Sequence, residues 1–153
     1  MASEIERKFL VDGQAWRQPA PLRIRQGYLN RDKERTVRVR IAGERAYLTI
    51  KGSMQGITRA EFEYPIALAD AEQLLPMCDG PLLEKNRHVL EHAGMTWEVD
   101  EFFGDNDGLV VAEIELSSED QMFERPAWLG VEVTHDRRYL NSNLISQPFK
   151  QWR

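Results

Sequence analysis

Charged side chains recur two residues apart along this chain, and each such pair carries a single sign. The acidic pairs are Glu4 and Glu6, Glu61 and Glu63, Glu98 and Asp100, and Glu113 and Glu115. The basic pairs are Arg23 and Arg25, Arg38 and Arg40, and Lys85 and Arg87. Paired carboxylates supply the oxygen ligands that a hard cation such as Mg²⁺ prefers, and clustered Arg and Lys suit phosphate oxygens. Both kinds of pair in one cavity would suit a polyphosphate chain with its metal.

A β-strand is the element that would place each pair on one face, because residues i and i+2 of a strand point the same way, about 6.6 Å apart. Lys8 extends the face of Glu4 and Glu6, and Lys51 ends the alternating stretch 46–50. The residues that stand between or next to the paired charges are mostly apolar: Ile5, Ile24, Val37, Val39, Phe62, Val99 and Ile114. Each strand is therefore expected to have one ionic and one apolar face.

The plainest explanation of such strands is a sheet with one face in the core and one in water. It explains the whole set poorly, because like charges close together on one face cost about 0.2–1 kcal/mol per pair. A sheet that closes into a barrel with its ionic face inward would direct every pair at a ligand. It would also account for a basic first part, with 13 Lys and Arg against 6 Asp and Glu in residues 1–60, and an acidic remainder, with 7 against 19.

Short stretches of period-2 alternation, separated by turns that contain glycine, predict mostly strands. The expected strands are 4–11, 23–30, 36–42, 46–51, 59–66, 83–92, 95–103, 109–116 and 130–134. Helices are expected over 67–75, over 118–123, where Ser118 and Gln121 have capping-box spacing, and over 141–145. Many short strands with few helices predict an α+β fold, mainly β, built as a barrel or sandwich.

The composition limits the class of protein. The 153 residues suffice for one domain with a hydrophobic core, and we expect residues 1–153 to form a single domain. The net charge of −5 argues against a general nucleic-acid binder. We expect a cytoplasmic protein with no membrane partner, because no apolar run reaches about 20 residues, the start of the chain lacks signal-peptide features, and a single Cys78 excludes an internal disulfide framework.

The ordered set of motifs resembles one family. The chain opens with Glu4-Ile5-Glu6-Arg7-Lys8, which reads Glu-x-Glu-x-Lys and resembles the signature of the CYTH superfamily, also called triphosphate tunnel metalloenzymes. The later motifs follow in the family's order: Arg25-Gln26-Gly27-Tyr28-Leu29, Val37-Arg38-Val39-Arg40, Leu48-Thr49-Ile50-Lys51, Arg59-Ala60-Glu61-Phe62-Glu63, Glu84-Lys85-Asn86-Arg87, Trp97-Glu98-Val99-Asp100, Ala112-Glu113-Ile114-Glu115 and Glu132–Tyr139. The resemblance covers nearly the whole chain.

The resemblance implies a closed eight-stranded antiparallel tunnel that binds a small-molecule triphosphate with Mg²⁺ or Mn²⁺. The short chain resembles the compact bacterial members, several of which resemble inorganic tripolyphosphatases. Carried over by position, the metal ligands are Glu4, Glu6, Glu113 and Glu115, with Asp100 as a further ligand. The phosphate ligands are Lys8, Arg38, Arg40, Lys51, Lys85 and Arg87, with Arg25, Arg59 and Arg138 as further candidates. Glu61 and Glu63 are other tunnel acids, and Glu6, Lys8, Arg40 and Lys85 are the expected catalytic residues.

Other functions remain open at this stage. An adenylyl cyclase or a thiamine or nucleoside triphosphatase would use the same tunnel, and a polyphosphate or nucleotide sensor would bind without turnover. The sequence leaves a homodimer open as well. The stretch His88-Val89-Leu90-Glu91-His92 matches a zinc-peptidase pattern that requires a helix, whereas we expect a strand there with His88 pointing away from the tunnel. Asp105–Gly108 is expected to form a hairpin turn.

Overall fold

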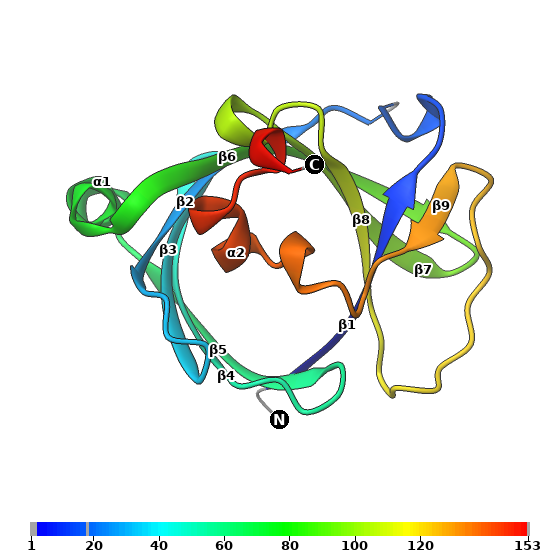
Figure 1. Ribbon diagram of the computed structural model, residues 1–153, viewed down its shortest axis with the longest axis horizontal. Coiled ribbons are helices and arrows are strands. Elements are labelled where there is room, and N and C mark those ends of the chain that lie inside the picture. Colours follow the sequence, from blue (N-terminus) through cyan, green and yellow to red (C-terminus); the bar gives the residue numbers. More distant parts are fainter. Residues whose placement is uncertain (1–2, 18, 153) are drawn as a thin grey trace.

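The computed structural model describes residues 3–17 and 19–152, and their strands close into a barrel (Figure 1). All pairings are antiparallel, in the order β5-β4-β3-β2-β6-β7-β8-β1, and β1 closes the ring against β5 by pairing Ser3–Ile5 with Thr58–Ala60. The strands are β1 (Ser3–Val11), β2 (Leu22–Asn30), β3 (Arg35–Ala42), β4 (Arg45–Gly52), β5 (Thr58–Ile66), β6 (Asp79–His92), β7 (Met95–Phe102), β8 (Val110–Glu115) and β9 (Leu129–Glu132). The expected eight-stranded antiparallel barrel is confirmed, and β9 adds a ninth strand beside the second half of β1.

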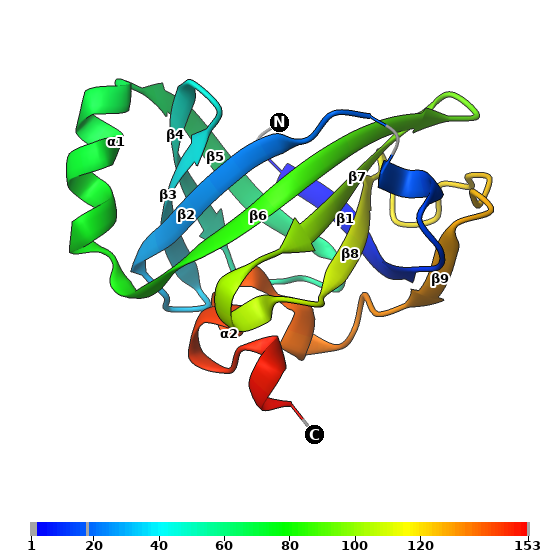
Figure 2. The ribbon, with the colours of Figure 1, turned by 90° about the horizontal axis from the view of Figure 1, so that it is seen from above.

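Short helices cover the side and one end of the barrel. Helix α1 (Leu68–Leu74) lies outside β3 and β4, and α2 (Asn141–Ser146) lies across one end of the bore (Figures 1 and 2). The 3₁₀ turns are η1 (Ala15–Arg17), η2 (Leu75–Met77), η3 (Gly104–Asn106), η4 (Arg137–Tyr139) and η5 (Phe149–Gln151). The helices expected at 67–75 and 141–145 are confirmed, and η3 forms the expected turn between β7 and β8. No helix in the described ranges is long and apolar enough to span a bilayer.

The helix expected over 118–123 is wrong, because this segment consists of turns and irregular chain. The Gln121 side-chain oxygen accepts hydrogen bonds from the Ser117 amide (2.6 Å) and hydroxyl (2.8 Å), and the Ser118 hydroxyl donates to Asp120 at 2.9 Å. Such local bonds offer the backbone an alternative to helical bonding. The segment instead directs Phe123 onto the barrel wall, with its ring centroid 5.5 Å from that of Trp97.

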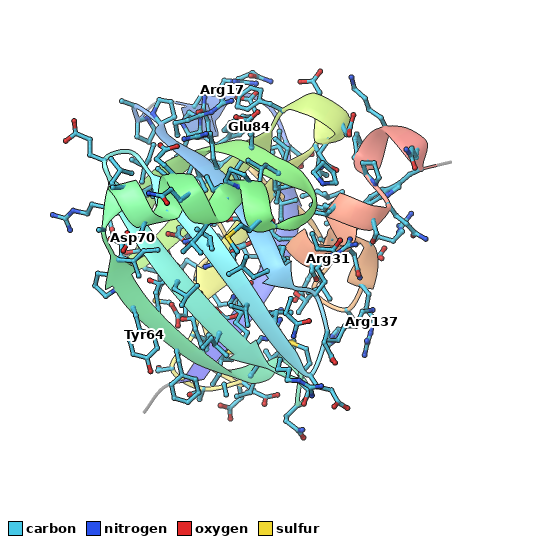
Figure 3. All side chains as sticks on the ribbon, turned by 90° about the vertical axis from the view of Figure 1, so that its left-hand side faces the viewer. Arg17, Arg31, Tyr64, Asp70, Glu84 and Arg137 are labelled. Carbon is cyan, nitrogen blue, oxygen red and sulfur yellow. The ribbon has the colours of Figure 1, made fainter. Side chains whose placement is uncertain are left out.

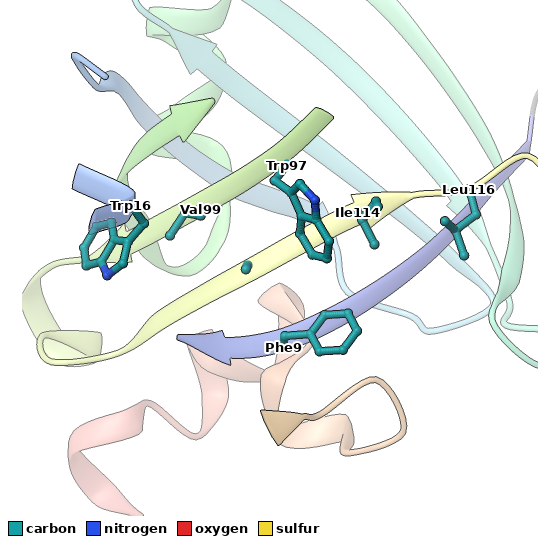
Figure 4. Packing of buried hydrophobic residues seen from close by; sticks show 7 residues of the cluster. Phe9, Trp16, Trp97, Val99, Ile114 and Leu116 are labelled. Atoms are coloured by element: carbon teal, nitrogen blue, oxygen red, sulfur yellow. The ribbon is translucent and has the colours of Figure 1, made fainter. Parts of the chain in front are cut away.

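The apolar faces of the strands point outward, and separate segments cover them. Phe9, Trp97 and Ile114 from β1, β7 and β8 pack with Trp16 into one buried cluster (Figure 4), covered by η1 and by the segment 117–128. A second cluster joins β3 and β4 to α1. The outer face of β5 beyond α1 stays exposed, with Tyr64 at 53% of its full accessibility (Figure 3). Because the apolar residues of these strands pack on the outer surface, the ionic residues that alternate with them point into the barrel.

Candidate active site in the barrel interior

A cavity of about 220 Å³ lies inside the barrel, and most of the residues that line it are charged. Its charged lining consists of Glu4, Glu6, Lys8, Arg38, Arg40, Lys51, Arg59, Glu61, Glu63, Arg87, Glu98, Glu113 and Glu115. The carboxylates come from the contiguous strands β7, β8, β1 and β5, and most of the cations come from β6, β3 and β4 on the other side of the ring. The cavity therefore has an acidic wall and a basic wall.

The basic wall contains guanidinium groups with different degrees of neutralisation. Arg87 donates two hydrogen bonds to Asp100, at 2.8 and 2.9 Å. Arg38 lies 3.5 Å from Glu63 and donates to the Thr49 hydroxyl at 3.2 Å. Within the described ranges the Arg40 side chain donates to one partner, the neutral Gln26, and burial together with repulsion from Arg38 and Arg87 lowers the pKa of Arg40 to about 9. An anion between these side chains would relieve that repulsion.

The acidic wall holds more carboxylates than the neighbouring lysines neutralise. Lys51 lies 2.7 Å from Glu4, and Lys8 lies 3.4 Å from Glu113 and 3.7 Å from Glu6. Burial and repulsion by Glu113 raise the pKa of Glu6 well above its usual value. Burial also raises the pKa of Glu115, with further repulsion from Glu4 and Glu61. Such a cluster gains from an additional positive charge.

The donor chemistry of this wall fits a hard divalent cation, because Glu4, Glu6, Glu113 and Glu115 offer carboxylate oxygens only. Among the residues the structure describes, no three or more such groups already stand together in a ligand geometry. Lys8 and Lys51 pair with several of the oxygens instead. An ion bound by these carboxylates would take the place of the ammonium groups.

Lys85 and Asp100 lie behind the cavity wall rather than on it. They form an ion pair at 2.8 Å, with side chains 0% and 1% exposed. Burial lowers the pKa of Lys85 to about 8, whereas Arg87 and Lys85 outweigh burial and lower the pKa of Asp100 to about 2. Since Asp100 is already held by two cations, the structure does not support it as a metal ligand. Lys85 is likewise absent from the residues that line the cavity.

Two further expected phosphate ligands lie outside the cavity. Arg25 points outward and lies 3.0 Å from Glu72 on α1, because its neighbours Ile24 and Gln26 occupy the inner face of β2. Arg138 lies 2.6 Å from Asp136, with its guanidinium 4.8 Å from the ring centroid of Trp152. Neither side chain is among the residues that line the cavity. Arg59 does line the cavity, and its Nε donates to the Gly52 carbonyl at 3.1 Å.

The charged pairs did not identify the neutral residues of the interior. Gln26 and Thr49 bond Arg40 and Arg38, and both follow the period-2 pattern of their strands, which could have revealed them. Thr134, Asn141 and Ser142 come from the segment that closes one end of the barrel, where no strand pattern exists. His88 lies on the outer face of β6, as expected, with its Nδ1 2.9 Å from the Pro19 carbonyl oxygen.

The fold and the cavity together define a class of protein: a β-barrel that covers its apolar outer face and keeps opposed acidic and basic walls inside. Comparison of the chain with known protein families leads to the same class. Residues 2–146 match the CYTH domain, and the chain therefore belongs to the CYTH family. Membership in this family of tunnel metalloenzymes implies dependence on a divalent metal.

Similar proteins cover almost the whole chain. It is 48% identical over 155 residues to a protein of Acetivibrio thermocellus named inorganic triphosphatase, covering 100% of this chain and 99% of the relative. A protein of Nitrosomonas europaea with the same name is 39% identical over 150 residues, covering 93% and 96%. The solved structure of the inorganic triphosphatase NE1496 superposes with a TM-score of 0.64 at 37% identity, covering 92% of this chain and 96% of that one.

Proposed function

We propose that this protein hydrolyses inorganic tripolyphosphate to diphosphate and phosphate with the help of Mg²⁺ or Mn²⁺. The observation that carries the proposal is the sorting of charge in the cavity, with carboxylates on β7, β8, β1 and β5 opposite cations on β6, β3 and β4. A polyphosphate with its metal needs both walls at once. The inorganic triphosphatases at 48% and 39% identity support the same reaction.

The basic wall would hold and polarise the phosphate chain. Water attacks the terminal phosphorus, the bond to the bridging oxygen breaks, and negative charge moves onto the leaving diphosphate. Arg38, Arg40 and Arg87 are the groups that would stabilise this charge, because preorganised cations act strongly where water is excluded. Lys8, Lys51 and Arg59 would fix the remaining oxygens. Lys85 would act through Asp100, by keeping Arg87 in place.

The acidic wall would hold the metal ion through Glu4, Glu6, Glu113 and Glu115, with Glu61 and Glu63 beside it. When bound, the ion supplies a positive charge that neutralises phosphate oxygens and activates water. Lys8, which lies between Glu6 and Glu113, would bridge this wall to a phosphate oxygen. Glu6 and Lys8 would therefore both touch the reacting complex.

Phosphate release tests the proposal most simply. Tripolyphosphate and ATP are compared side by side with Mg²⁺, with Mn²⁺ and with EDTA. We expect fast, metal-dependent release from tripolyphosphate and little from ATP. Preference for ATP, followed by identification of cyclic AMP or ADP as product, would replace the proposal with a cyclase or nucleoside triphosphatase. Affinity for tripolyphosphate without turnover would replace it with a sensor.

The proposal extends to the whole molecule. Residues 1–153 would act as one CYTH domain on a small-molecule substrate in the cytoplasm, without nucleic acid or membrane as partner. The molar mass of the protein in solution distinguishes a monomer from the homodimer that the sequence leaves open.

A further inference from the structure

Arg40 is a cation of the cavity wall that no carboxylate neutralises at close range within the described part of the chain. Arg38 lies 3.5 Å from Glu63, and Arg87 lies 2.8 Å from Asp100. The hydrogen bond of the Arg40 side chain runs from Nε to the Gln26 side-chain oxygen, at 3.2 Å. A guanidinium group has five N–H donors, so this single bond leaves its four terminal N–H groups for another acceptor.

Gln26 is a fully buried amide of the barrel interior. It is 0% exposed, on the inner face of β2, in register with Arg40 on β3 and with Leu83 on β6. Its Nε2 has no hydrogen-bond partner among the described residues. A buried donor without a partner destabilises a fold relative to an apolar group of the same shape. The stability of the fold therefore does not explain an amide at this position, whereas the hydrogen bond that its oxygen accepts from Arg40 does.

The chemistry of an amide matches that use. A carboxylate at this position would also accept from the Arg40 Nε, but it would neutralise the guanidinium group, as Asp100 does with Arg87. An amide oxygen fixes the orientation of the guanidinium plane and leaves its charge for the substrate. Gln26 does not line the cavity, so it acts on the substrate only through Arg40.

We propose that Gln26 is a positioning residue, which holds Arg40 by its Nε so that the terminal nitrogens of Arg40 bind phosphate oxygens of the substrate. This inference rests on the proposed triphosphatase function and names a residue that the charge pattern does not reveal. If Gln26 positions Arg40 in this way, the neutral charge of its side chain matters for activity as much as its hydrogen bond does.

Three substitutions test the two requirements. Gln26→Leu removes the acceptor and keeps the size of the side chain, and Gln26→Glu keeps the acceptor but adds a charge. We expect either change to lower kcat/KM for tripolyphosphate about 10- to 100-fold, as misplacement of a binding group does. Gln73→Leu is the matched control on the exposed face of α1 and should leave activity unchanged. Gln26→Leu should unfold in urea at the same or a higher concentration than the wild type, a result that a purely structural role would not give.

A double-mutant cycle with Arg40→Lys identifies the route of the effect. Lysine has no Nε–H group at that position, so Gln26→Leu should cost nothing further in the Arg40→Lys background. An equal fold-loss in both backgrounds, or wild-type activity of Gln26→Leu, would overturn the inference. The same cycle is also measured for binding, as the affinity of each variant for tripolyphosphate determined by calorimetry in EDTA. If the wild type binds but does not hydrolyse tripolyphosphate, the proposed function fails while this affinity cycle still tests Gln26.

Discussion

Single carboxylates of the barrel interior differ in what neutralises them. Asp100 is fully buried between Lys85 and Arg87, which hold its pKa at about 2. Among the described residues Glu6 forms one ion pair, with Lys8 at 3.7 Å, and burial and Glu113 raise the pKa of Glu6. Replacement of Asp100 should therefore affect mainly the stability of the fold, and replacement of Glu6 should affect mainly activity.

Glu6→Gln should abolish metal-dependent turnover while the protein stays folded. The amide keeps the size of the side chain, removes one like charge from the repelling cluster and supplies a poorer metal ligand. We expect at least a 100-fold loss of phosphate release with Mn²⁺ and an unchanged or slightly higher melting temperature. Glu124→Gln, at an exposed position, is the control. Wild-type activity of Glu6→Gln would remove Glu6 from the site.

Asp100→Asn should destabilise the protein by about 3–5 kcal/mol, because it leaves Lys85 and Arg87 as buried charges without their partner. Urea unfolding measures this loss. Asp105→Asn makes the same chemical change in the exposed turn after β7 and should alter stability by less than about 0.5 kcal/mol. If the two variants were equally stable, the ion pairs around Asp100 would not hold the interior together.

At the scale of elements, β9 depends on an ion pair as well as on backbone pairing. Arg7 of β1 donates to both carboxylate oxygens of Glu132 at 2.8 and 2.6 Å. This hydrogen bonding lowers the pKa of Glu132 from its usual 4.5 to about 2. The pair therefore fixes β9, and with it the chain that leads to η4 and α2, against the edge of β1.

Glu132→Gln should cost about 0.5–1 kcal/mol at neutral pH, since the pair is partly exposed to solvent. A carboxylate with a lowered folded-state pKa stabilises the protein fully above its unfolded value. The difference from the wild type should thus persist down to about pH 4.5 and shrink as the pH falls toward about 2. Unfolding curves of both proteins at a series of pH values measure it. A difference that stayed constant with pH would exclude the ion pair as its origin.

The sequence predicts elements best where alternation is strict. The period-2 spacing of Glu4, Glu6 and Lys8 along β1 correctly places these three charges on the inner face of the barrel. The same reasoning fails for Arg23 and Arg25, since spacing alone does not say which face of a strand is internal. Ile24 and Gln26 are the inward residues of β2. The segment 117–128 was not predictable from its capping-box spacing, because side-chain bonds to the backbone replaced helical ones.

At the scale of the whole molecule, the barrel reverses the common arrangement of a small protein. Two of its apolar clusters lie outside the ring, under α1, η1 and the segment 117–128, and a third joins the barrel to Tyr139 and Leu144 of η4 and α2 at one end, while its paired ionic residues lie within. The cost of burying many charges is reduced by ion pairs between nearby strands, such as Arg87 with Asp100 and Lys8 with Glu113. These ion pairs leave excess negative charge around Glu6 on one wall and excess positive charge around Arg40 on the other. A complementary ligand therefore carries both a positive and a negative part.

A crystal structure of the protein with tripolyphosphate and Mn²⁺ tests this account most directly. We predict phosphate density along Arg38, Arg40 and Arg87, and an anomalous Mn²⁺ peak next to Glu4, Glu6, Glu113 or Glu115. The terminal nitrogens of Arg40 should contact a phosphate oxygen, with Nε still bonded to Gln26. Tripolyphosphate bound on the outer surface, with the cavity between the two walls left to solvent, would contradict the account.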